Sequence, residues 1–86
     1  MRYWVGIRVG YGQAAFTAFL PDLDSVAQAD TVEQAVAKAH ELATKAIDAL
    51  RLVGKPIPPP TPQRDLFERM EYRGCFWVTV ALDTTA

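Results

Sequence analysis

The feature that most restricts the fold is an alanine-rich helix predicted between Thr31 and Gly54. Thr31 and Gln34 have the spacing of a capping box, and Gly54 followed by Pro56 ends the helix. The apolar residues between them recur at three- and four-residue spacing and form one stripe: Val32, Ala35, Val36, Ala39, Leu42, Ala43, Ala46, Ile47 and Leu50. Because most of these side chains are small, the helix can lie close to a sheet that carries larger residues.

Strand patterns precede this helix. The segment "RYWVGIRV" at 2–9 alternates in the manner of a strand, with Tyr3, Val5, Ile7 and Val9 on one face. "GYGQ" at 10–13 predicts a reversal into "AAFTAFL" at 14–20, and Pro21 closes that strand. A third short strand is expected at 25–29 from its position after the turn at 21–24.

Three further segments follow the helix. "KPIPPPTP" at 55–62 predicts a stiff, extended connector, because clustered prolines hold the backbone near polyproline geometry. A short helix is expected over 63–73, and "GCFWVTVAL" at 74–82 alternates again as a last strand. We therefore expect one domain over 1–86, with β-β-β-α elements over 1–54.

These elements predict an α+β fold of β-β-β-α-β order. It would have a three-stranded antiparallel meander, one covering helix, and a last strand parallel to the first through a right-handed crossover.

Composition excludes several classes of protein. The 86 residues suffice for one core, and a net charge of −1 gives no basic surplus for binding nucleic acid directly. The single Cys75 excludes an internal disulfide and a cysteine-based zinc site. The longest apolar stretch, around 76–82, is too short to span a membrane, and the amino terminus does not resemble a leader. A cytoplasmic protein is the simplest interpretation.

No residue pattern indicates catalysis, a metal or a cofactor. Asp22, Asp24 and Asp30 are close in sequence, but turn and cap positions account for all three. His40 has no nucleophile or acid in a recognisable arrangement, and Cys75 fits a small apolar role. A metal-dependent nuclease stays open as an alternative, to be tested by RNA cleavage that requires added magnesium or manganese.

The last strand and the aromatic residues indicate self-association. "CFWVTVAL" carries no charge and no proline, so it would be an unprotected edge in a monomer. We expect a homo-oligomer, a dimer or tetramer, whose contacts include Trp4, Phe76, Trp77, Val78, Thr79 and Val80. The alternative is that Trp4 and Trp77 pack under the short helix.

Over residues 3–62 the sequence resembles the HicB antitoxins of bacterial toxin–antitoxin pairs. The resemblance rests on the hydrophobic hairpin running into "PDL" at 21–23, on "ADTVEQA" at 29–35 opening the alanine-rich helix, and on "GKPIPPP" at 54–60. It implies a partial RNase H-like fold that binds and inhibits a small RNA-cleaving toxin of the HicA type. Family members often read Pro-Gly-Cys after "PDL", whereas this chain has Asp24, Ser25 and Val26. Residues 63–74 have no place in the family pattern. Full-length members commonly carry a carboxy-terminal DNA-binding domain, whereas this sequence stops after its predicted last strand, so direct operator binding is not expected.

The resemblance also suggests a binding surface. Four acids at the turn and the helix start, together with one leucine of the turn, are expected to bind a basic toxin and mask its catalytic surface. These residues are Asp22, Leu23, Asp24, Asp30 and Glu33. Solvated surface charge is the plain alternative for each acid. A different possibility is an orphan oligomeric module that binds or regulates without a toxin. A neighbouring gene for a small basic protein would favour the antitoxin, and its absence would favour the orphan module.

Overall fold

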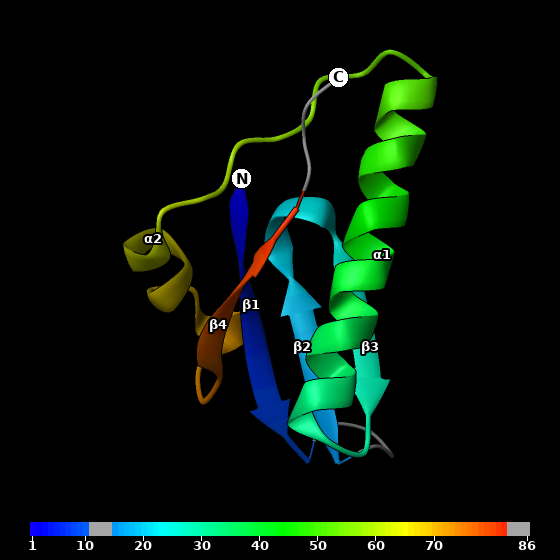
Figure 1. Ribbon diagram of the computed structural model, residues 1–86. Coiled ribbons are helices and arrows are strands. Elements are labelled where there is room, and N and C mark those ends of the chain that lie inside the picture. The colour runs from blue at the N-terminus through cyan, green and yellow to red at the C-terminus, as the bar shows by residue number, and fades with distance from the viewer. Residues whose placement is uncertain (11–14, 83–86) are drawn as a thin grey trace.

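The computed structural model describes residues 1–10 and 15–82 and shows a sheet with a long helix across one face (Figure 1). The strands are β1 (Arg2–Val9), β2 (Phe16–Leu20), β3 (Ser25–Ala29) and β4 (Phe76–Ala81), in the order β3-β2-β1-β4. The helices are α1 (Val32–Leu52) and α2 (Gln63–Phe67), with 3-10 turns η1 (Pro21–Leu23) and η2 (Met70–Tyr72). The predicted α+β class and the β-β-β-α-β order are confirmed.

The first hairpin joins β1 to β2. Gly10 has a φ of 75°, a conformation that glycine adopts at little cost, and its N–H donates to the carbonyl of Ala15 at 2.9 Å. Residues 11–13 of the predicted turn and residue 14, the predicted start of the second strand, lie outside the described residues. Among the described residues, the second strand begins at Phe16.

The core lies between α1 and one face of the sheet. Tyr3, Val5 and Ile7 of β1 are fully buried, whereas Val9 at the strand end is exposed. The buried residues of α1 are Ala35, Ala39, Ala43 and Ile47, which confirms the predicted stripe at these four positions, whereas Leu42 of that stripe is exposed. At the start of α1, the Thr31 hydroxyl accepts a hydrogen bond from the Gln34 N–H at 3.1 Å, which satisfies one of the free donors of the first turn. Short side chains thus let α1 pack closely over β2 and β3 (Figure 1).

The predicted direction of the last strand was wrong. β4 lies beside β1 as expected, but the two strands are antiparallel, with Tyr3 opposite Val80 and Val5 opposite Val78. The reason is an extra pass of the chain. After α1, residues 53–75 run back along the sheet before β4 starts, so β4 enters from the end where β1 finishes (Figure 1). A single helical crossover would have given the parallel arrangement.

Residues 63–73 lie against the second face of the sheet around Trp77, but not as the single helix predicted. α2 ends at Phe67, and Arg69 has extended backbone (φ −74°, ψ 127°) before η2 begins. This break brings two rings to Trp77: the Phe67 ring at 5.5 Å and the Tyr72 ring, edge-on, at 5.6 Å between centroids. Leu66 is fully buried. α2 and η2 therefore form a second, thin layer over Trp77.

Candidate partner-binding site

The 3-10 turn η1 shapes the site where β2 passes to β3. Pro21 starts the turn with its fixed φ, and Asp24 ends it in the left-handed region (φ 50°, ψ 46°). Aspartate tolerates this conformation better than most residues. The Asp24 N–H donates to the Pro21 carbonyl, and the Ser25 hydroxyl donates to the Leu23 carbonyl at 3.1 Å. The turn is thus held by local hydrogen bonds, and the Asp24 side chain is left exposed.

Asp22 has a structural task in this turn. Its carboxylate accepts a hydrogen bond from the Thr61 N–H at 3.0 Å and another from the Thr61 hydroxyl. These bonds join η1 to the proline-rich connector, 39 residues away in sequence. Asp22 is therefore less available to a partner than Asp24.

Tyr3 fixes the same connector from the sheet. Its hydroxyl donates to the Pro58 carbonyl at 2.7 Å. Burial raises the pKa of the Tyr3 hydroxyl above the usual value of 10.0, and the negative charge of Asp22 raises it further. The connector is thus anchored at both Pro58 and Thr61, which holds it in place beside η1.

A groove of about 550 Å³ lies between η1, the last turns of α1 and the connector. Its lining is mainly apolar, with acids and one lysine among the lining residues: Asp22, Leu23, Asp24, Ala46, Ala49, Leu50, Val53, Lys55 and Pro58. Val53 is 65% exposed. The groove therefore offers apolar surface next to the exposed carboxylate of Asp24.

The helix side of this groove was not predicted as a site. The sequence contains a pattern that could have indicated it, since the lining residues follow the same three- and four-residue spacing as the core stripe: Ala46, Ala49, Leu50 and Val53. They form a second stripe, one step around the helix from the buried residues. Two of them, Ala46 and Leu50, were assigned to the core stripe, and the structure finds both only partly buried.

The five predicted toxin-binding residues fall into two groups. Asp22, Leu23 and Asp24 lie together at η1, near the carboxyl end of α1. Asp30 and Glu33 are exposed at the other end of β3, where α1 begins (Figure 1). The five residues of β3 separate the groups by about 17 Å at the usual rise per residue. Only the first group borders the groove.

The predicted self-association residues lie on β4, at the edge of the sheet, and on β1. Phe76 is 43% exposed on the α1 side, whereas Val80 is buried there. Trp77 faces the opposite side, as predicted, and packs under α2 and η2 with Phe67 and Tyr72. Trp4 is half-buried on that same side, opposite Thr79.

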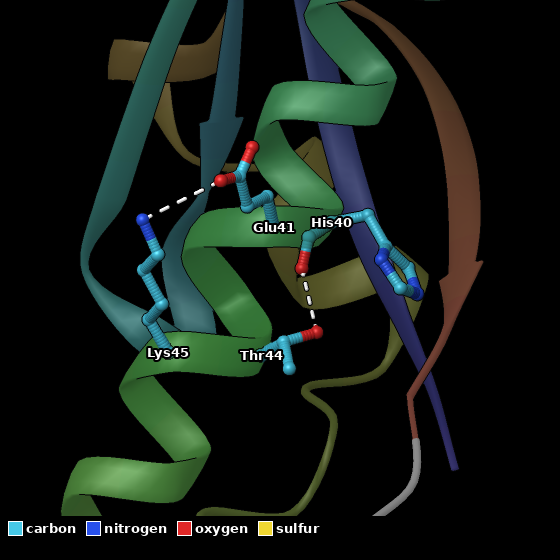
Figure 2. A network of polar contacts seen from close by, with 4 residues as sticks. All are labelled: His40, Glu41, Thr44 and Lys45. Atoms are coloured by element: carbon cyan, nitrogen blue, oxygen red, sulfur yellow. Dashed lines mark hydrogen bonds and ion pairs between the residues drawn. The ribbon is translucent and has the colours of Figure 1, made fainter.

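Within residues 1–10 and 15–82, the remaining candidate residues, His40 and Cys75, do not form a catalytic arrangement with neighbouring side chains. His40 lies on α1, and its Nε2–H donates a hydrogen bond to the Ala81 carbonyl oxygen, with 3.0 Å between the nitrogen and the oxygen. Figure 2 shows its ring turned away from the Glu41–Lys45 ion pair on the same helix. Cys75 is a half-buried free thiol. No group of three or more His, Cys, Asp or Glu in these ranges could hold a metal ion, and no helix in them is long and apolar enough to cross a membrane.

Comparisons with known proteins agree with this architecture. The N-terminal domain of the Burkholderia pseudomallei antitoxin HicB has the same fold, with a TM-score of 0.82 at 19% identity over 96% of this chain and 99% of that one. A chain of the HicA3 and HicB3 toxin–antitoxin complex is 25% identical, with a TM-score of 0.72 and the same coverage. A search among curated protein sequences found no match. The family model of the HicB-like antitoxin of bacterial toxin–antitoxin systems matches residues 3–86, and the chain therefore belongs to that family.

Proposed function

We propose that this chain binds a small RNA-cleaving toxin of the HicA type and neutralises it by covering the toxin's active surface. The observation that carries the proposal is family membership over residues 3–86. The likeness to a chain of a toxin–antitoxin complex, along nearly the whole of both chains, supports it. The role is then one of binding rather than catalysis. We infer that the encounter takes place in the cytoplasm, where the RNA that such a toxin cleaves is found.

We further propose that the toxin docks at the groove beside η1. A protein that binds RNA presents basic side chains to phosphates, so an acidic antitoxin surface can occupy the same positions. Asp24 supplies exposed negative charge at the groove, and Leu23, Leu50 and Val53 supply apolar surface for a side chain of the toxin. Apolar contact at the centre with charge nearby is the usual arrangement of protein interfaces.

Asp30 and Glu33 take a secondary part in this proposal. They lie at the far end of β3 and do not border the groove. Exposed charges at such a distance act mainly on the association rate, and salt weakens their effect. Their neutralisation should therefore slow association at low salt and leave the dissociation rate unchanged.

The first experiment uses the gene beside this one. Its product is expressed alone and together with this chain, and growth, co-purification and RNA cleavage are measured. The proposal expects a small basic protein that arrests growth alone, is silenced by this chain and co-purifies with it. A neighbour that neither binds nor arrests growth would contradict the antitoxin function and leave the orphan oligomeric module. RNA cleavage by this chain alone, dependent on magnesium or manganese, would point to the nuclease instead.

The docking site is tested with two matched substitutions on α1 and just after it. Val53→Arg places a long cation in the groove lining, whereas Leu52→Arg changes the adjacent residue, which is 89% exposed and does not line the groove. Loss of one well-packed apolar contact is expected to weaken toxin binding about ten-fold for Val53→Arg, and less than about two-fold for Leu52→Arg. Titration calorimetry measures both, with circular dichroism as the folding control. Equal affinities for the two variants would remove the groove from the proposal without touching the antitoxin function.

A further inference from the structure

We infer that two copies of this chain pair through β4, antiparallel, about a two-fold axis at Val78. Two four-stranded sheets would then join into one sheet of eight strands. Within the described part of the chain, β4 pairs with β1 on one side, and no strand pairs with its other side. Charged side chains and prolines on an edge strand commonly prevent such pairing, and the segment from Cys75 to Leu82 contains neither.

The hydrogen-bond pattern shows which backbone groups of β4 face outward. Met1 and Leu82 exchange two bonds: the Leu82 N–H donates to the Met1 carbonyl at 2.9 Å, and the Met1 amine donates to the Leu82 carbonyl at 3.1 Å. Hydrogen-bonded pairs alternate along an antiparallel ladder. Val80, Val78 and Phe76 therefore also bond to β1. The N–H and C=O groups of Trp77, Thr79 and Ala81 point away from β1, toward the open edge.

Both ends of this open edge are already engaged within the chain. At the start of β4, the Cys75 N–H donates to the Tyr72 carbonyl at 3.2 Å. At the end, the Ala81 carbonyl accepts the hydrogen bond from His40, whose ring points from α1 toward β4 (Figure 2). The middle of the edge keeps the N–H and C=O of Trp77 and of Thr79.

These four groups select one register. A two-fold axis at Val78 places Trp77 of one copy opposite Thr79 of the other, and the reverse on the far side of the axis. Each such pair exchanges two hydrogen bonds, so all four groups of each copy find a partner. An axis at Thr79 would instead pair Trp77 with Ala81, whose carbonyl His40 already binds. Pairing at Val78 therefore satisfies the edge with the least rearrangement.

The side chains on the α1 face fit the same register. Phe76 remains 43% exposed although it lies in the apolar stripe of the sheet, because α1 lies mainly over β2 and β3 (Figure 1). In the paired sheet, Phe76 would face Val80 of the second copy, and the two Val78 side chains would meet at the axis. The second copy would thus cover apolar surface that α1 leaves open, which argues for this occupant rather than another protein.

The first test is the mass of the chain in solution across a range of protein concentrations. Light scattering after gel filtration should give about twice 9.5 kDa for the natural chain. Phe76→Lys replaces the apolar contact with Val80 of the second copy by a charge without a partner there, and is expected to raise the dimer dissociation constant about ten-fold or more. Val26→Lys is the matched control, because Val26 is a 54% exposed apolar residue on the opposite edge strand. It should change the constant less than about two-fold.

A cross-link keeps the inference testable even if Phe76→Lys does not fold. In a Cys75→Ser background, Val78→Cys places two thiols on facing residues of a pair that is not hydrogen-bonded, with Cα atoms about 4.5 Å apart. That separation lies within the disulfide range. Mild oxidation should give a covalent dimer for Val78→Cys and none for Val26→Cys. A natural chain that stays monomeric, or a dimer that cross-links through Val26→Cys alone, would overturn the inference, and neither result bears on toxin binding.

Discussion

Gly6 is the position where one added carbon atom tests how the second layer is packed. The Cβ of an alanine at this site would lie 3.0 Å from Cη2 and 3.1 Å from Cζ3 of the Trp77 ring. Carbon atoms prefer about 3.5–4.0 Å, so the ring would have to move by about 0.5 Å or more. The ring is itself in contact with Phe67 and Tyr72, and any movement must be passed on to α2 and η2.

The expected cost of Gly6→Ala follows from two opposing terms. Overpacking of this kind costs about 1–3 kcal/mol. Gly6 does not need a positive φ, so alanine also gains about 0.4–1 kcal/mol by restricting the unfolded chain. The net result is a loss of about 1–2 kcal/mol in the free energy of unfolding. In a Trp77→Val background the clash is absent, and the same substitution should be neutral or slightly stabilising.

The assay is a double-mutant cycle of Gly6→Ala and Trp77→Val. Urea unfolding is followed by far-ultraviolet circular dichroism at one low protein concentration, because association would add to the apparent stability. A coupling free energy of about 1–3 kcal/mol between the two sites is expected. If Gly6→Ala costs the same with and without the tryptophan, Trp77 does not press on Gly6, and the packing of the second layer is misassigned.

Three further predictions concern the anchors of the connector and the helix start. Asp22→Ala should cost about 1–2 kcal/mol in urea unfolding because both Thr61 donors lose their partner, whereas Thr61→Val, which keeps the N–H bond, should cost less. Thr31→Ala removes the cap of α1 and should cost about 1 kcal/mol in the same assay. The raised pKa of Tyr3 means that the unfolded chain loses this proton first. Stability should therefore hold below about pH 10 and fall above it, and Tyr3→Phe should reduce that fall.

The sequence was sufficient where one local pattern determined one element. The cap at Thr31, the alanine stripe and the Gly54–Pro56 stop predicted α1 nearly to the residue, because each signal acts within one or two helical turns. The faces of β1 and β4 followed from the two-residue period in the same way. These are properties of short segments, and they do not depend on where the rest of the chain goes.

The direction of β4 depended on a segment with no such pattern. Residues 53–75 contain clustered prolines and then two short helical turns. The spacing of their residues does not indicate the path that this segment takes along the sheet. The bonds that fix their path are long-range: Asp22 to Thr61, Tyr3 to Pro58, and Arg8, which donates to the carbonyls of Glu71 and Arg73 at 2.7 and 2.8 Å. Side chains from η1 and β1 thus determine where this segment lies. A prediction that treats the segment only as a spacer misses the additional reversal.

The candidate site was divided for a related reason. Closeness in sequence suggested that the acids from Asp22 to Glu33 act together, but β3 separates them because an extended strand holds its two ends far apart, at opposite ends of the sheet. The groove instead joins η1 to residues of α1 more than twenty positions later. Only the antiparallel run of α1 beside β3 brings these together.

The two proposed surfaces lie on different flanks of α1, and this has a consequence for stoichiometry. Ala46, Ala49 and Val53 line the groove beside η1, whereas His40 reaches the edge of β4 from the other flank of the helix. A second copy on β4 would therefore leave both grooves open, and a dimer could hold two toxins at once. The mass of the purified complex then distinguishes the cases. Two antitoxins with two toxins fit separate surfaces, whereas a complex of one antitoxin with one toxin, formed from a dimeric antitoxin, would mean that the toxin occupies β4 itself.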